Sequence, residues 1–338
     1  MAVQISSGID HPQLLVLLAD GQLHSGECLA RRLGVSRAAV WKGVERLRRF
    51  GIGVQASARR GYQLAQAVEL LDARRIGESL CKEGARRLQQ VELLFAVDST
   101  SNRLLAGDPP PYGCAHACLS ELQTAGRGRR GRRWIAPFGG SITMSVGWSF
   151  RDSARVLPSL SLSVGVAIAR ALARVGARDV KLKWPNDIWF DDRKLGGVLI
   201  ELKAEAGGPA YVVIGVGINL WMNATTRRAI EAMGVRVACV SEVCPIPPAR
   251  NRLVGILLDE ILSVLMSFET TGFAPLRQAW EALDTLRGRA AEVLVGERVI
   301  AGTACGVDEE GALLLRVGEC THKFVSGEVS LRLSKEVN

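Results

Sequence analysis

A glycine-rich segment concentrates the positive charge that could bind an anion. Residues 126–134 read GRGRRGRRW. The first six match GxGxxG, but arginine fills every position that is not glycine, whereas a dinucleotide-binding fingerprint joins a strand to a helix and has an acidic residue about 20 positions on. Arginines on a glycine backbone suit a mobile loop that closes over a phosphate. A solvated basic linker is the alternative interpretation.

A second motif places a cation, an amide and a carboxylate at one turn. Lys183 ends an expected strand that begins at Val180, and the sequence continues as Trp-Pro-Asn186-Asp187. Proline fixes the local backbone and disfavours helix at the residue before it. The motif fits a site for a charged ligand, and equally an ordinary surface turn that half-buries its tryptophan.

Two expected strands bring a further cation and a further amide together. The motif RKLGG, with Lys194 in second place, opens the first strand, and GVGIN, which ends in Asn219, closes the second. If the hairpin turn is centred between Ala206 and Gly207, antiparallel register sets Lys194 opposite Asn219. Glycines in strands let a ligand approach the backbone, although bulges and tight packing explain them equally often.

The first 65 residues are typical of a winged helix-turn-helix. A helix over Leu14–Leu18 precedes one that begins at the N-cap Ser25 and stops at Gly34. A third begins at Ser36 and reaches Gly51, and a basic hairpin suited to a wing follows. The expected DNA contacts are Ser36, Arg37, Lys42, Arg46, Arg59 and Arg60. A trihelical protein-interaction module with solvated charges is the alternative.

The rest of the chain predicts three further parts. Residues 66–90 form a partly helical linker, 91–286 an α+β domain and 287–338 a small β-barrel. Strands are expected at 91–97, 117–123, 141–150, 194–202 and 211–220, and helices at 159–175, 250–268 and 273–284. The C-terminal strands are expected in AAEVLVG, RVIAGTACGVD, GALLLRVG and HKFVSGEVSL. The fold class is therefore α+β and multidomain.

Composition narrows the classes of function. The chain has 338 residues, too many for one ordinary core, and its net charge of +9 favours an acidic partner such as nucleic acid or nucleotide. No apolar run reaches the ~20 residues of a membrane helix, and the N-terminus lacks the pattern of a secretion signal. We expect a cytoplasmic protein with no membrane partner.

Cysteine spacing argues against a disulfide framework and a metal centre. The eight cysteines are scattered and include no CxxC pair, so reduced thiols are expected. Cys114, His116 and Cys118 form the nearest approach to a metal cluster, but strand alternation explains that spacing as well.

Taken together, the motifs resemble the biotin protein ligase family. DSTSN at 98–102, Gln123 ahead of GRGRRGRRW, then KWPND, RKLGG and GVGIN occur in that family's order and spacing. The N-terminal HSGE…LGVSRAAVWK…RRGYQL and the C-terminal GVDEEGALLL…SGEVSLR resemble the regulatory branch that doubles as the biotin operon repressor. The resemblance spans residues 11–333 and implies a mixed-sheet ligase domain of the biotin/lipoate type and an SH3-like C-terminal barrel.

This resemblance implies a two-step reaction. The biotin carboxylate attacks the α-phosphate of ATP, with Mg²⁺ assisting, which forms biotinyl-5′-AMP and releases pyrophosphate. A lysine of the biotin carboxyl carrier protein of acetyl-CoA carboxylase then takes the biotin. The branch also implies operator DNA as a partner and a homodimer in the adenylate-bound state, formed through an edge of the central sheet.

The resemblance also assigns roles to single positions. The catalytic residues are Lys194, Arg129, Arg127 and Asp187, and Asp187 is also the magnesium ligand. The biotin-binding residues are Ser99, Thr100, Ser101, Gln123, Arg127, Gly128, Arg129, Lys194, Gly215 and Gly217. The residues that bind ATP and the adenylate are Gly126, Arg132, Lys183, Asn186 and Asn219.

Two departures from the family pattern leave questions open. DSTSN replaces the common DSTN, so either Ser101 or Asn102 takes the biotin-contact position. Some members place a tryptophan over the adenine in the stretch after GIN, where this chain has none apart from the nearby Trp221. The alternatives are a lipoate or octanoate ligase, a biotin-sensing transcription factor without ligase activity, and a ligase that has lost its operator.

Overall fold

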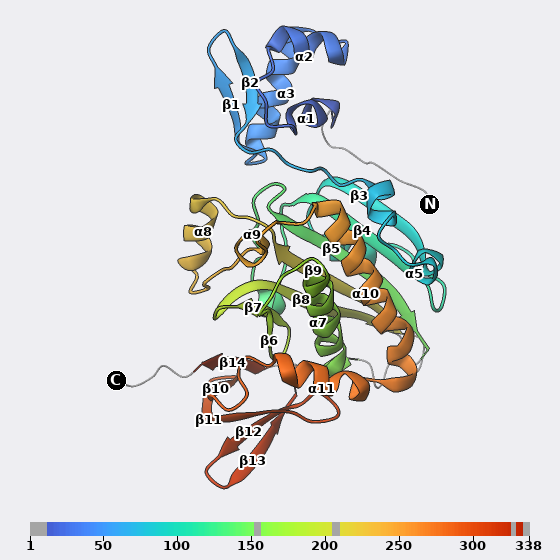
Figure 1. Cartoon of the computed structure of the whole chain (residues 1–338), viewed down its shortest axis with the longest axis vertical. Helices are drawn as coiled ribbons and strands as arrows, with labels where there is room; N and C mark the ends of the chain where they lie inside the picture. Colours follow the sequence, from blue (N-terminus) through green and yellow to red (C-terminus); the bar gives the residue numbers. More distant parts are fainter. Residues whose placement is uncertain (1–11, 152–156, 205–209, 326–328, 334–338) are drawn as a thin grey trace.

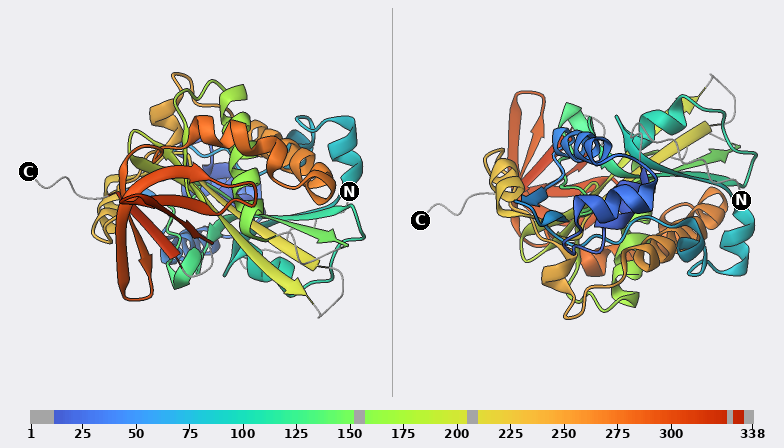
Figure 2. Two further views of the ribbon diagram at one scale, coloured as in Figure 1. Left: turned by 90° about the horizontal axis from the view of Figure 1, so that it is seen from below. Right: turned by 90° about the horizontal axis from the view of Figure 1, so that it is seen from above.

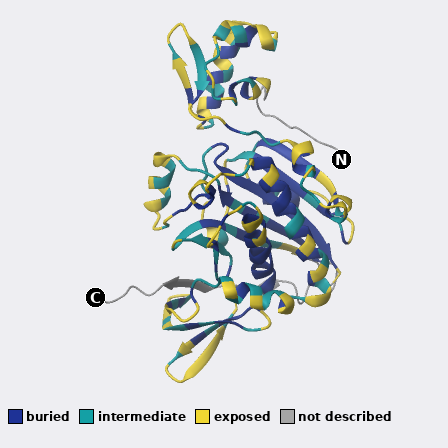
Figure 3. Cartoon of the chain, viewed as in Figure 1, coloured by how far each residue is buried: buried dark blue, intermediate teal, exposed yellow. Residues whose placement is uncertain are grey.

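The chain folds into three successive parts (Figure 1). The computed structural model describes residues 12–151, 157–204, 210–325 and 329–333. A winged helix and a C-terminal sheet lie at opposite ends of a larger central domain, as the views from below and above also show (Figure 2). Buried residues concentrate in the central sheet and its helices (Figure 3).

The N-terminal part is the expected winged helix-turn-helix. It contains α1 (Pro12–Leu18), α2 (Gly26–Leu33), α3 (Arg37–Arg49) and the hairpin β1 (Val54–Ser57) and β2 (Gly61–Leu64). The predicted N-caps are confirmed, because the side chains of Ser25 and Ser36 accept hydrogen bonds from the backbone N–H groups of Cys28 and Ala39. Gly34 ends α2 in the left-handed conformation, with φ of 67°.

The linker is helical in part and packs on the central domain. It forms α4 (Ala73–Gly77) and α5 (Lys82–Arg87), which contact α10 (Arg250–Thr271). The next strand, β3 (Leu88–Val97), begins three residues before the expected position. The linker is thus fixed along a long core helix.

A seven-stranded mixed sheet forms the centre, in the order β3-β4-β5-β9-β8-β7-β6. The strands are β4 (Ala115–Gln123), β5 (Ser141–Phe150), β6 (Lys181–Lys183), β7 (Asp187–Phe190), β8 (Arg193–Ala204) and β9 (Ala210–Asn219). β3 and β4 are parallel, and the other neighbours are antiparallel. This confirms the predicted α+β class.

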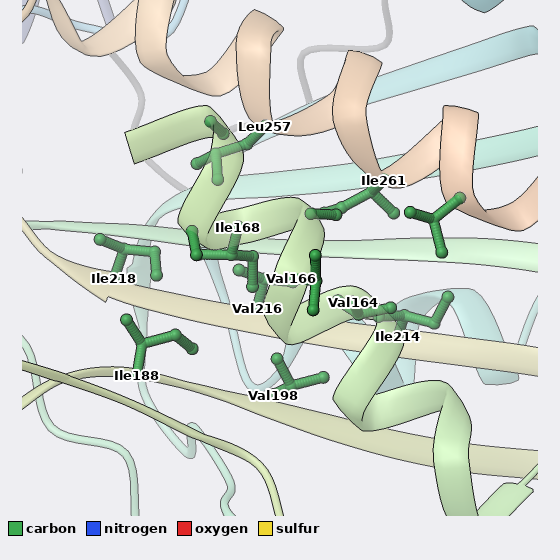
Figure 4. Close-up of a cluster of buried hydrophobic side chains, with 14 of the residues drawn as sticks. Val164, Val166, Ile168, Ile188, Val198, Ile214, Val216, Ile218, Leu257 and Ile261 are labelled. Atoms are coloured by element: carbon green, nitrogen blue, oxygen red, sulfur yellow. The ribbon is translucent and has the colours of Figure 1, made fainter. Parts of the chain in front are cut away.

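One face of this sheet is closed by α7 (Leu157–Arg174) and α10. Alternate residues of β8 and β9, such as Val198, Val216 and Ile218, pack there against Ile168 and Leu257 (Figure 4). The short α6 (Thr100–Leu105) lies on the other face, against β4, β5 and β9. That second face carries the candidate site.

Several short elements were not predicted. They are α6, β7, α8 (Ala224–Glu231) and α9 (Val240–Val243). Each is so short that apolar periodicity over one or two turns gives little signal.

The C-terminal part follows α11 (Ala274–Leu283). It consists of β10 (Ala290–Val295), β11 (Arg298–Val307), β12 (Leu313–Val317), β13 (Cys320–Phe324) and β14 (Val329–Leu333). They form an antiparallel sheet in the order β13-β12-β11-β10-β14. The segment HKFVSGEVSL thus contributes to two strands. The outer strands β13 and β14 do not pair with each other in the described residues, so the sheet is SH3-like without the closed barrel that we predicted.

The predicted pairing of Lys194 with Asn219 is wrong by one residue. The register pairs Gly197 with Gly217, so the hairpin is centred on residue 207 and not between Ala206 and Gly207 as we assumed. The turn itself, at 205–209, lies outside the described residues. Asn219 nevertheless reaches Lys194, since its Nδ2 donates to the Lys194 carbonyl at 3.3 Å.

Asp284 joins the central domain to the C-terminal sheet. Its backbone bridges to Leu182 of β6, and the N–H of Thr285 donates to the Leu182 carbonyl at 2.9 Å. Its Oδ1 accepts from the N–H of Leu286 at 2.9 Å, whereas its Oδ2 is buried and without a hydrogen-bond partner in the part of the chain described. Burial raises the pKa of the Asp284 carboxyl to about 6.

Replacing Asp284 by Asn should stabilise the protein above pH 6. Because the folded carboxyl holds its proton more tightly than the unfolded one, the native stability that it supports is lost as the pH rises from about 4 to 6. Asp284→Asn removes this loss, worth up to ~3 kcal/mol for a pKa raised from 3.8 to about 6. Urea unfolding of the wild type and of Asp284→Asn at pH 4.5 and pH 7.5 measures this difference in the free energy of unfolding.

Asp308→Asn is the matched control, with the opposite sign. Burial acts to raise the pKa of the Asp308 carboxyl, but hydrogen bonds from Ala312, Lys323 and Glu310 together outweigh it and lower that pKa. That variant should therefore lose stability, and more at pH 7.5 than at low pH. A stability of Asp284→Asn that followed the wild-type pH profile would contradict the assignment.

Candidate functional site

A cavity of about 790 Å³ lies on the face of the sheet opposite α7 and α10. Its walls are the start of α6, the loop 127–135, the turn 183–187, strands β8 and β9, and the segment 230–237. Every predicted substrate-site residue lines it except Gly126, which is buried behind the loop. The tertiary structure therefore gathers motifs that are far apart in sequence.

Two glycines make the floor of the cavity thin. An added Cβ at Gly215 would lie 2.9 Å from Ser101 Oγ, and one at Gly217 would lie 2.6 Å from the indole of Trp134. No real Cβ tolerates such contacts, so only glycine lets α6 and Trp134 approach the strand this closely. The glycines of GVGIN thus allow Ser101 and Trp134 to pack directly against the backbone of β9.

A β-bulge aims Lys194 into the cavity. Gly196 pairs with Ile188 and Lys194 with Trp189, so β8 has one extra residue, Leu195, opposite β7. The extra residue is fully buried in the core, and Lys194 turns to the cavity side. Its Nζ forms an ion pair with Asp187 Oδ1 at 2.6 Å.

Asn219 holds the backbone around this lysine. Its Nδ2 donates to the carbonyls of Lys194 and Ala238, at 3.3 and 3.1 Å. The N–H of Lys194 donates to the Arg236 carbonyl and the N–H of Ala238 to the Lys194 carbonyl, both at 2.9 Å. The amide therefore positions Lys194 and the segment after α8.

The arginine loop folds as a hairpin beside the cavity. The N–H of Gly128 donates to the Arg132 carbonyl at 2.7 Å, and that of Trp134 to the Gly126 carbonyl at 2.8 Å. Arg127 forms an ion pair with Glu201 of β8 at 2.8 Å. Burial lowers the pKa of Arg129, opposed by the attraction of Asp187.

Hydroxyl groups cluster at the start of α6. Thr100 donates its N–H to Gln123 Oε1 at 2.8 Å, and the hydroxyls of Thr100 and Ser101 lie 2.8 and 3.0 Å from that of Ser145. Ser101 lines the cavity. Asn102 does not, because its Nδ2 donates to Asp98 Oδ2 at 2.6 Å.

Sequence reasoning missed several side chains of the site. They are Trp134, Ser145, Trp189, Glu201 and Met233. Trp134 was adjacent to a recognised motif, and its Nε1 is buried without a partner in the described residues. The others lie on strands or loops whose orientation only the fold sets. Trp221 is not at the cavity: it packs with the cluster beneath the winged helix.

Positive charge dominates the cavity. Its basic side chains are Arg127, Arg129, Arg130, Arg132, Arg133, Lys183, Lys194 and Arg236, and its acidic ones are Asp187 and Asp192. Asp187 bonds Lys194, and Asp192 bonds Arg289 of the C-terminal part at 2.9 Å. Lys183 Nζ lies 4.2 Å from the ring centre of Trp189, a cation–π contact. The arrangement suits a polyanionic ligand beside a small polar one.

The predicted DNA contacts lie on the winged helix. Arg37, Lys42, Arg59 and Arg60 are exposed, Ser36 caps α3 and Arg46 is half-buried. Arg48 donates to the Val54 carbonyl at 3.0 and 2.9 Å and so fixes the wing.

Two further findings concern the described residues as a whole. They hold no cluster of three His, Cys, Asp or Glu side chains that could bind a metal by itself, and no helix among them is long and apolar enough to cross a membrane.

Comparison with known families matches each of the three parts. Residues 99–219 match the Biotin/lipoate A/B protein ligase family, 13–63 an HTH domain and 288–332 the Biotin protein ligase C terminal domain.

Whole-chain relatives agree. The chain is 37% identical to the bifunctional ligase/repressor BirA of Escherichia coli over 96% of this chain and 98% of that one. It is 30% identical to the biotin–[acetyl-CoA-carboxylase] ligase of Paracoccus denitrificans, over 66% of this chain and 93% of that one. The biotin protein ligase of Aquifex aeolicus in complex with biotin and ATP has a TM-score of 0.62 at 28% identity, covering 73% of this chain and 100% of that one.

Gly217→Ala should open the arginine loop. The new Cβ displaces the Trp134 indole, and overpacking of this kind costs about 1–3 kcal/mol, or ~5- to 150-fold in the open population. Limited trypsin digestion reads this out, because the loop is rich in arginine, and cleavage within 127–133 should accelerate by that factor.

Gly197→Ala is the control for this change. Its Cβ would meet only the end of Lys194 and the Asp187 carboxylate, at 3.3–3.4 Å. It should leave loop cleavage near the wild-type rate. Equal cleavage of the wild type and Gly217→Ala would show that the glycine does not hold the loop closed.

Proposed function

The chain belongs to the biotin protein ligase family, in its bifunctional ligase and repressor branch, and from this premise we propose how its residues divide the two tasks. It is an ATP-dependent biotin–[acetyl-CoA-carboxylase] ligase and a transcriptional repressor. The observation that carries the proposal is the ring of cations around one cavity, with a winged helix on the same chain.

The cations meet the main demand of the first step. A carboxylate and a triphosphate repel each other until positive charge and oriented donors surround them. Lys194, Arg127 and Arg129 supply that charge. The biotin carboxylate oxygen bonds to the α-phosphorus, the bond from that phosphorus to the bridging oxygen breaks, and pyrophosphate leaves with the electron pair.

Biotin lies at the start of α6. The hydroxyls of Ser99, Thr100 and Ser101, with Gln123, offer donors and acceptors for the ureido ring, and Gly215 and Gly217 form the floor. Gly128 and its arginine neighbours cover the ligand. We assign the biotin contact to Ser101, because Asn102 is held by Asp98 outside the cavity.

The nucleotide occupies the other half of the cavity. Arg132, Lys183 and Asn186 lie around it, Gly126 supports the loop from behind, and Asn219 acts through the backbone of Lys194. Magnesium belongs to this proposal with Asp187 as its one carboxylate, a donor set that fits because Mg²⁺ takes one or two carboxylates and completes its shell with phosphate oxygens and water. The ion would neutralise phosphate charge.

The second step transfers biotin to the carrier protein. The lysine amine of the biotin carboxyl carrier protein forms an amide bond with the biotin carbonyl carbon, AMP leaves and the amine loses a proton to solvent.

The two other functions fit less well. The arginine loop and the C-terminal sheet favour biotin over lipoate or octanoate, and an intact cationic cavity argues against a sensor without ligase activity.

The operator-binding form is a dimer in this proposal. β7 pairs with β8 only as far as Gly197, and no described strand pairs with that side of residues 199–203. This open edge carries Glu201, which bonds Arg127 of the loop. A ligand that draws Arg127 inward therefore changes the edge, which links adenylate binding to self-association.

The direct test incubates the protein with biotin, ATP and apo carrier domain and weighs the carrier. We expect an added biotin. Lys194→Ala should slow pyrophosphate release by ~10²–10³, or ~2.7–4 kcal/mol, because it removes a charge fixed at the reacting phosphate. Lys203→Ala, on the same strand and outside the cavity, should retain the wild-type rate. An unmodified carrier would refute ligation, and normal release in Lys194→Ala would refute the lysine's role.

Arg129→Gly should separate making the adenylate from keeping it. It removes a contact with the bound anion and adds freedom to the open loop, so both effects favour opening. We expect faster release of biotinyl-adenylate, followed by rapid mixing, and biotin on bystander albumin, detected with streptavidin. Arg130→Gly is the control for flexibility. Arg130 has φ of 58°, which glycine adopts without strain, so this variant should release less biotinyl-adenylate than Arg129→Gly does.

Operator binding should depend on both ligands. Footprinting of the biotin-synthesis promoters with and without biotin and ATP measures this, and Arg37→Ala or Lys42→Ala should weaken binding while carrier biotinylation continues. Half-sites should be separated by whole turns of about 34 Å. Affinity indifferent to biotin and ATP would contradict the coupling, and loss of both activities in the variants would contradict the separation of the two tasks.

A further inference from the structure

Trp41 stands out on the recognition helix because it is exposed. Its relative exposure is 54%, while Val40 and Val44 beside it are buried at 1% and 0%. An indole carries a large apolar surface, and water contact with it is unfavourable. Trp41 therefore lies outside the apolar core of the winged helix and presents much of its indole to solvent.

The surroundings of Trp41 are those of a DNA-reading surface. Arg37, Ala38 and Lys42 are also exposed, so the first two turns of α3 present a basic face with one aromatic group. One turn further on, Glu45 forms an ion pair with Arg48 at 2.6 Å, and Arg48 holds the wing. The residues best placed for bases are those around Trp41, because the N-terminal residues of a recognition helix contact the base edges.

We propose that Trp41 is a specificity residue that reads the methyl group of a thymine in the major groove. The inference rests on the proposed repressor function and adds which base the helix selects at this position. The indole has a single N–H donor and no acceptor, so it cannot make the bidentate contacts that read guanine or adenine. Thymine C5-methyl is the apolar group that the major groove offers.

The spacing along α3 gives the pattern of the half-site. Arg37 and Trp41 are four residues apart, which is about 6 Å along the helix axis and corresponds to roughly two base-pair steps at most. Arg37 is suited to guanine. A half-site should thus contain a guanine and a thymine within about two steps of each other.

The test begins with selection of duplexes from a random pool, with the full-length protein in the presence of biotin and ATP. Each thymine of the enriched duplex is then replaced by deoxyuridine, which removes only the methyl group. At one position per half-site we expect a loss of affinity of about 3- to 5-fold for wild type. Trp41→Ala should bind the thymine duplex about 10-fold more weakly and be indifferent to that methyl.

Controls separate this role from general effects. Val16→Ala removes another exposed apolar side chain of the same domain, 61% exposed on α1, and should keep wild-type affinity. Carrier biotinylation by Trp41→Ala should be unchanged, which shows that the central domain is intact. Uniform weakening of Trp41→Ala on every duplex, with the methyl effect retained, would overturn base reading. A pool with no enriched duplex would overturn operator binding itself, and the role of Trp41 with it.

Discussion

Mutual repulsion among the cations around one cavity is the constraint on which the rest of the structure depends. Arginines of the loop and two lysines face the same space, and such a site opposes folding unless the charges are partly neutralised. The protein does this with the pairs Lys194–Asp187 and Arg127–Glu201 and with the backbone hydrogen bonds of the loop hairpin. In the proposed function, phosphate oxygens replace these internal partners, so the charges that repel one another favour an anion.

The fold aims these charges by keeping the two faces of one sheet different. One face is a continuous apolar core beneath α7 and α10, which fixes the strands (Figure 4). On the other, glycines leave room for α6 and Trp134, and the bulge at Leu195 sends Lys194 toward the cavity while Leu195 itself stays in the core. The placement of Lys194 at the cavity thus depends on packing on the far side of the sheet.

The winged helix is attached through contacts that reach the site. Phe50, at the end of α3, packs against Phe95 of β3, and Phe95 packs against Phe138, which follows the arginine loop. A buried polar network ties the linker to the core: Arg250 pairs with Glu121 of β4, and Asn251 bonds Glu69 and the N–H of Asp72. Breaking one partner of such a pair would leave a buried charge unsatisfied. The segment that follows the arginine loop and the end of the recognition helix therefore contact the same residue, Phe95.

The sequence by itself determined the local features. Caps at Ser25 and Ser36, the long apolar helices and the order of the motifs all arise from neighbouring residues, so pattern and propensity predict them. Only the tertiary structure decided the rest. The register around Lys194 depends on a bulge opposite β7. The position of Ser101 in the cavity lining, with Asn102 outside it, depends on Ser145 and Asp98. The entry of Trp134, Trp189 and Glu201 into the site depends on strand order. These are contacts between residues distant in the chain, whose energies do not show in any local pattern.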